Sequence, residues 1–229
     1  MLLSEDAFRA LASSSPWRWR ALEFVRHATA EEERVEARID RPGRMRLTDA
    51  SGHTRTVVDR PGSGSFLSSF GYGPPPPPPI HRTPLDVIPP LRADGLVAER
   101  PERIPAQDGE VWVHYDDPME QNYRWVAMLD PYELSTGTTA TDLALVEHRG
   151  RPAWAATMTA IDGYEPRCGC CPLLHSAVAH RDEYGPDEKP YRPFPEWCRV
   201  MLDVETGVVV SLVESDGRVV IDLEIAAVE

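Results

Sequence analysis

Three of the four cysteines lie within four positions, in the stretch EPRCGCCPLLH. These are Cys168, Cys170 and Cys171, and Cys198 follows further along the chain. With His175, such thiols could form a Cys₃His zinc site, because thiolate sulfur and imidazole nitrogen are the ligands that zinc prefers. Thiolates are also nucleophiles, so the same residues could support redox or sensor chemistry.

The neighbouring sequence bears on both the redox and the zinc interpretation. A redox C-x-x-C motif belongs in a βαβ setting, whereas the flanking segments alternate as antiparallel strands. Pro172 could open a helix, and thiols at its N-terminus would then favour the thiolate form. A zinc site needs a fourth ligand, which His175 or His180 could supply beside Cys198.

A disulfide is the third possibility. Adjacent Cα atoms are about 3.8 Å apart, so a bridge between Cys170 and Cys171 would be strained. A bridge from Cys168 or Cys171 to Cys198 would not be. Since the connection at 163–196 is long for a compact domain, we expect the cysteines to close it. The Cys198 sulfur should then lie within bonding or ligation reach of Cys168, Cys170 or Cys171.

Other residues that could support chemistry form weaker patterns. His114, Asp116 and Asp117 could bind a metal or exchange protons, but on a strand they are more typical of a solvated edge. The chain has no nucleophile elbow, phosphate-binding loop or H-E-x-x-H motif. Three tryptophans could line a ligand cavity or belong to an ordinary core: Trp112, Trp125 and Trp154.

The net charge of −13 argues against a nucleic-acid binder, because a phosphate backbone would be repelled. The first 20 residues lack the apolar stretch of a signal peptide, so we expect a cytoplasmic location. No run of about 18 apolar residues predicts a membrane span.

Two helices are predicted near the N-terminus. Ser4 is a suitable cap for the first. Ser15 and Pro16 suggest a second start, followed by an apolar stripe at helical spacing from Trp17 to Ala28. From residue 34 the apolar period changes to two, which predicts a strand meander. A further helix is predicted over MEQNYRWVAMLD.

A Gly/Ser/Pro-rich loop at 61–84 interrupts the meander, and its run Pro74–Pro79 cannot join a sheet interior. This run could dock an SH3- or WW-like partner or act as a spacer. One more strand is expected at GEVWV and five after residue 140, joined by hairpin turns such as HRGR, ETG and SDG. The chain therefore predicts one α+β domain over residues 1–229, with an antiparallel sheet of about eight or nine strands.

The second half resembles the LolA/RseB-like half-barrel superfamily of bacterial proteins. The carrying motifs are ALVEHRGRPAWAATMT and RVMLDVETGVVVSLVESDGRVV, with RPGRMRL as an earlier match. The resemblance implies a strongly curved antiparallel sheet wrapped around helices, with a cavity for acyl chains or a partner peptide.

We therefore predict a non-enzymatic binding protein that holds an apolar ligand, such as a lipid or acyl chain, or a peptide in a concave sheet. The alternative is a metal- or thiol-dependent enzyme or sensor centred on the cysteines. Zinc is the one cofactor that the residues suggest. The candidate metal or disulfide residues are Cys168, Cys170, Cys171, Cys198 and His175; the candidate ligand-binding residues are the three tryptophans.

Overall fold

The computed structural model describes residues 3–58, 81–106 and 109–229. Its helices are α1 (Glu5–Arg18), α2 (Tyr123–Leu129) and α3 (Ala177–Tyr184), with 3₁₀ turns η1 (Pro84–Asp86) and η2 (Tyr132–Leu134). The strands of the large sheet are β1 (Ala21–Arg26), β2 (Val35–Asp40), β3 (Arg44–Asp49), β4 (Thr54–Val58), β8 (Thr138–His148), β9 (Arg151–Ala160), β10 (Cys198–Asp203), β11 (Val209–Glu214) and β12 (Val219–Val228). A small sheet holds β5 (His81–Arg82), β6 (Arg103–Ala106) and β7 (Gly109–Val113).

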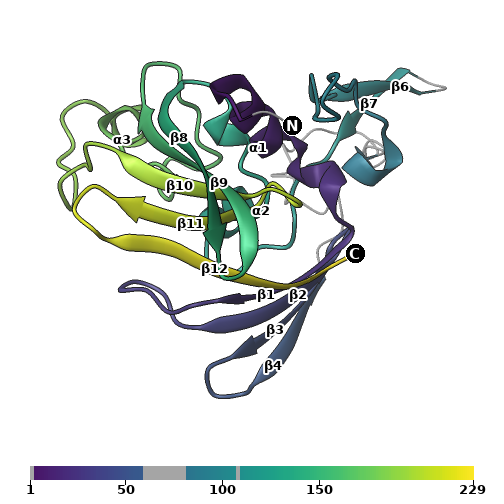
Figure 1. Ribbon diagram of the computed structural model, residues 1–229, viewed down its shortest axis with the longest axis horizontal. Coiled ribbons are helices and arrows are strands. Elements are labelled where there is room, and N and C mark those ends of the chain that lie inside the picture. The colour runs from purple at the N-terminus through teal and green to yellow at the C-terminus, as the bar shows by residue number, and fades with distance from the viewer. Residues whose placement is uncertain (1–2, 59–80, 107–108) are drawn as a thin grey trace, which may run out of the picture.

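The large sheet confirms the predicted fold class. Its nine strands follow the order β4-β3-β2-β1-β12-β11-β10-β9-β8, and all of its pairings are antiparallel. In Figure 1 the half formed by β1–β4 turns away from the half formed by β8–β12, and the sheet stays open. The architecture is an α+β half-barrel.

The curvature of the sheet has local causes. Register shifts interrupt the pairings of β1 with β12, β10 with β11, β11 with β12, and β8 with β9. Such bulges bend a strand and increase its twist. The β8–β9 hairpin turns on Arg149 and Gly150, with φ values of 48° and 79°. Two positive φ values are what a tight two-residue hairpin requires.

One hydrophobic core joins the helices to the sheet. Phe8 and Leu11 of α1 and Trp125 and Leu129 of α2 are almost fully buried. Burying one such side chain stabilises a fold by about 1.5–3 kcal/mol. The same core includes side chains from many strands, among them Leu22, Ile39, Leu202, Leu212 and Leu223.

The predicted second helix is wrong. The α1 helix continues through Pro16 to Arg18, and the apolar residues that follow form β1. In β1, Leu22 and Phe24 alternate into the core while the backbone pairs with β2 and β12. A six-residue apolar segment fits either period, and pairing on both sides favours the strand.

The sequence predicted one antiparallel sheet that includes the strand at GEVWV, but this strand, β7, belongs to a separate small sheet. The strand order of the small sheet is β5-β7-β6, so β6 is an edge strand. In Figure 1 the small sheet lies on the far side of α1 from the large sheet. Most of the predicted loop at 61–84, including Pro74–Pro79, lies outside the described residues. Among the residues that the structure describes, no helix is long and apolar enough to cross a membrane.

Candidate functional site

A groove of about 580 Å³ lies between α1, residues 97–103 and η2. Its volume falls within the range of about 300–1,000 Å³ that is typical of ligand sites. The charged side chains that line it are Asp6, Arg9, Arg92, Glu99, Arg100, Glu102 and Arg103. A second cavity of about 270 Å³ shares Arg100, Glu102 and Tyr132 with the groove, so the two hollows adjoin.

Arg100 lies where the two hollows meet and is held by a buried carboxylate. Its guanidinium donates to both oxygens of Asp130, at 2.7 and 2.8 Å, and Arg167 donates to the same carboxylate at 2.7 Å. Burial alone would raise the pKa of Asp130, but the two arginine charges outweigh it and hold the pKa below its usual range. The carboxylate therefore stays ionised and fixes both guanidinium groups.

Two aromatic rings contact the guanidinium group of Arg100. Its guanidinium carbon lies 3.9 Å from the ring centre of Tyr115 and 4.3 Å from that of Tyr132. Burial raises the pKa of Tyr115 to about 12, so its hydroxyl stays protonated and donates to the carbonyl oxygen of Pro101 at 2.6 Å. Tyr132 is 42 % exposed.

The wall formed by residues 97–103 is irregular, with bends at 98, 99 and 102, and leads into edge strand β6. In the described part of the chain, the backbone of Glu99 and Arg100 makes no hydrogen bond. Arg103 begins β6, and its guanidinium carbon lies 3.9 Å from the ring centre of Trp112 in β7. The groove therefore combines unpaired backbone with exposed arginine and aromatic side chains.

The three tryptophans do not form one site. Trp125 and Trp154 are 2 % and 3 % exposed and belong to the core, where Trp125 packs on Phe24 with ring centres 5.3 Å apart. Trp112 is 49 % exposed and contacts Arg103, which lines the groove. Trp125 and Trp154 thus pack against other side chains of the core and do not line an open cavity.

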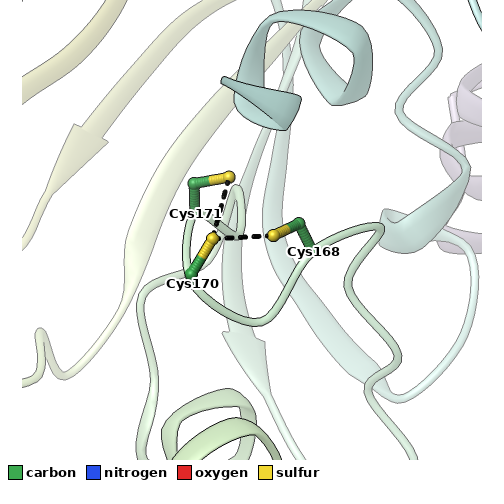
Figure 2. A group of neighbouring side chains, drawn as sticks. All are labelled: Cys168, Cys170 and Cys171. Carbon is green, nitrogen blue, oxygen red and sulfur yellow. Dashed lines mark hydrogen bonds between the residues drawn. The ribbon is translucent and has the colours of Figure 1, made fainter. Parts of the chain in front are cut away.

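The cysteines of the CGCC turn come together (Figure 2). The sulfurs of Cys168 and Cys170 are 2.8 Å apart and those of Cys170 and Cys171 are 3.7 Å apart. The backbone N–H of Cys171 donates to the carbonyl oxygen of Cys168 at 3.3 Å, which closes the turn. All four cysteines are free thiols.

No helix begins at Pro172, although that position could have opened one; the next helix, α3, begins at Ala177 with Ser176 as its cap. The turn is held instead by a buried carboxylate, Glu133 of η2. Its two oxygens accept hydrogen bonds from the backbone N–H groups of Arg167, at 2.9 Å, and Leu173, at 2.8 Å.

Those two residues flank the cysteines, so one carboxylate fixes both ends of the turn. The Tyr164 hydroxyl donates to the same carboxylate and accepts a bond from the Leu174 N–H at 3.1 Å. Burial raises the pKa of Glu133, although these hydrogen bonds oppose the shift.

Cys198 and His175 lie outside the group of three sulfurs. Cys198 is buried in β10, where it pairs with Met158 and Glu214. The His175 ring packs against Phe194, with ring centres 4.9 Å apart. Among the described residues, the only group of three or more His, Cys, Asp or Glu side chains whose ligand atoms all lie within 4.8 Å of one another is Cys168, Cys170 and Cys171. Closure of the long connection through Cys198 is not formed here and stays a prediction.

The acidic residues near His114 serve ion pairs. Asp117 accepts two hydrogen bonds from Arg41, at 2.8 and 2.7 Å, and this pair is almost fully buried. Asp116 forms an ion pair with Arg167, and Nε2 of His114 lies 3.9 Å from a carboxylate oxygen of Asp116. The sequence missed the groove and Glu133, since their parts come from segments that are distant in the chain and carry no local motif.

Comparison with known proteins gives only distant similarity. No protein-family model matches this chain, and no curated protein does. Among solved structures, the crystal structure of MucB matches with 15 % identity and a TM-score of 0.39, over 98 % of this chain and 59 % of that one. The complex of Pseudomonas aeruginosa MucA/MucB matches with 16 % identity and a TM-score of 0.38, over 98 % and 58 %. The chain spans less than two thirds of either structure.

Proposed function

We propose that this protein is a non-enzymatic binding protein that takes an extended, partly acidic peptide in the groove between α1 and residues 97–103. The observation that carries the proposal is the composition of the groove. Exposed arginine and tyrosine side chains border a stretch of backbone that has no hydrogen-bond partner among the described residues. Arg, Tyr and Trp are the residue types most enriched at binding hot spots.

An extended peptide fits these features better than an acyl chain does. A peptide strand can add to the edge of β6, as in β-strand addition, and its neighbouring residues can hydrogen-bond to the unpaired backbone at Glu99 and Arg100. Its carboxylates can pair with Arg103, which is half-exposed and whose one acidic partner among the described residues is Glu110, at 3.5 Å. An acyl chain would leave these charged and backbone groups without partners.

The proposal keeps the LolA/RseB-like relationship as a hypothesis about ancestry. Its support is the pair of turns at His148–Arg151 and Asp203–Gly207, which join strands of the open sheet as that pattern requires. The apolar cavity that the resemblance implies is not part of the proposal.

Peptide display tests the groove directly. Random peptides displayed on phage are selected on the full chain, and an enriched peptide is then measured by fluorescence anisotropy. We expect Arg103→Glu and Tyr132→Ala each to weaken binding at least about tenfold, since truncation of a hot-spot residue costs about 2 kcal/mol or more.

Two matched variants serve as controls. Arg34→Glu changes an arginine that is similarly exposed and also pairs with one glutamate, and Tyr123→Ala changes a tyrosine that is 44 % exposed. Neither residue lines the groove, so binding should be unchanged. The proposal is wrong if no peptide is enriched or if all four variants bind alike. A lipid in the native mass spectrum that is lost in Tyr132→Ala would instead favour the apolar ligand.

A further inference from the structure

The three thiols of the CGCC turn suggest a function that the groove does not explain. We propose that Cys168, Cys170 and Cys171 bind one Cu(I) ion through three thiolate sulfurs. The site lies on a separate surface turn and is independent of the proposed peptide binding.

The sulfurs already converge on one point. They come from positions one, three and four of a single turn, and all three lie within 4.8 Å of one another (Figure 2). Around an ion with metal–sulfur distances of about 2.3 Å, three sulfurs in a plane lie about 4 Å apart. The separation of 3.7 Å between Cys170 and Cys171 is close to this value. Cys168 and Cys170, at 2.8 Å, must move apart by about 1 Å, which a rotation of the exposed Cys170 side chain allows.

The backbone around the sulfurs is fixed in advance. Glu133 holds the N–H groups of Arg167 and Leu173 on the two sides of the turn. At Gly169, a Cβ atom would lie 2.4 Å from a carboxylate oxygen and 2.6 Å from the Cβ of Glu183 in α3. Glycine therefore allows α3 to pack on the turn. Supported ligands of this kind lose little entropy when an ion binds.

The number and type of ligands favour Cu(I) over a structural zinc ion. Structural zinc is almost always four-coordinate, and among the described residues no histidine, aspartate or glutamate joins the three sulfurs. Thiolates are soft ligands that select Cu(I). Cys170 is exposed and Cys168 half-buried, so an ion can enter and leave, and the net charge of −13 attracts a cation.

Copper competition tests the site on the full chain. The reduced protein is titrated without oxygen with tetrakis(acetonitrile)copper(I) in the presence of bathocuproine disulfonate, a coloured competitor for Cu(I). We expect one Cu(I) per chain. We expect Cys168→Ala and Cys170→Ala each to weaken the affinity at least about 100-fold, since even a lost supporting contact costs 10–100-fold.

Cys198→Ala is the control, because that thiol is in β10 and outside the cluster. The copper affinity of Cys198→Ala should match that of the wild type. Circular dichroism is used to check that each variant is folded. Three results would overturn the proposal: no binding by the wild type, equal binding by Cys170→Ala, or a Cys168–Cys170 disulfide that persists in the reduced protein. A parallel titration with Zn²⁺ that gives tighter binding to the same three cysteines would overturn the choice of copper.

Discussion

Replacing Asp130 by asparagine removes one buried negative charge with almost no change in side-chain volume. The Asp130 side chain is fully buried, and the Arg100 side chain that it binds is 6 % exposed. In Asp130→Asn the Arg100 guanidinium keeps its charge in the interior but loses its counter-ion. Arg167 loses the same partner and keeps Asp116.

The expected loss of stability follows from the short contacts between Arg100 and Asp130, at 2.7 and 2.8 Å. Two unit charges about 4 Å apart interact by about 4 kcal/mol at an effective dielectric constant of about 20. Removing one partner of a buried ion pair costs about 3–5 kcal/mol. Since Arg167 retains a partner, we expect the free energy of unfolding to fall by about 3 kcal/mol. Urea unfolding followed by tryptophan fluorescence would then show a midpoint lower by about 1.5 M, for a slope of about 2 kcal/mol per M.

The matched control is Asp162→Asn. Asp162 also contacts an arginine, Arg181, at 3.4 Å, but it is 92 % exposed, and exposed pairs contribute at most about 1 kcal/mol. Equal losses in the two variants would refute the reasoning. The pKa of Asp130 is lowered in the fold. Its contribution is therefore complete above the unfolded-state value of about 3.9 and is lost as the pH falls through the folded-state pKa.

Three further results are expected. Gly137→Ala places a Cβ 2.0 Å from the backbone nitrogen of Tyr164 at a φ of 62°, and should lower the free energy of unfolding in urea by at least about 3 kcal/mol. The control Gly217→Ala has open space around the new Cβ and should lower it by about 1–2 kcal/mol. Similar losses of stability in the two variants would contradict the predicted clash. Burial, followed by the charge of Arg192, lowers the pKa of His175 to about 4, so stability should decrease from pH 6.5 to pH 4, and His175→Phe should flatten this slope in thermal melts. Glu133→Ala leaves the buried donors of Tyr164 and Leu173 without an acceptor, at about 1–3 kcal/mol each, together with the partly buried N–H of Arg167. It should speed the reaction of the cysteine thiols with Ellman's reagent, and an unchanged rate would show that Glu133 does not hold the turn.

The strands and hairpins could be predicted from the sequence because their signals are local. Period-two alternation marks β2 and β3, and the turn at Arg149–Gly150 carries its own backbone requirement. The exception is β1, whose residues Phe24 and Val25 also fit a helical stripe with Trp17. Its identity as a strand depends on β12, nearly the whole chain away, and no short window contains that information.

The sites depend even more on distant contacts. The sequence predicted that the three cysteines of the turn matter, but it could not predict that Glu133 anchors them. The groove needs Arg9 from α1, Arg103 from β6 and Tyr132 from η2. Arginine and tyrosine are ordinary surface residues until the fold brings them to one place, so composition and spacing carry no trace of the groove.

The pairing of β1 with β12 also bears on how the protein folds as it is synthesised. Leu22 pairs with Val228, so β1 stays unpaired on one side until β12 has been synthesised and has left the ribosome. The meander β1–β4 and the hairpins β8–β9 and β10–β11 can form early, because their contacts are local. Joining the two halves is a late, long-range step, and such steps are slow and expose unpaired edges to aggregation. A nascent chain stalled before β12 would therefore carry a preformed N-terminal meander with nowhere to dock, which makes it a natural client for chaperones.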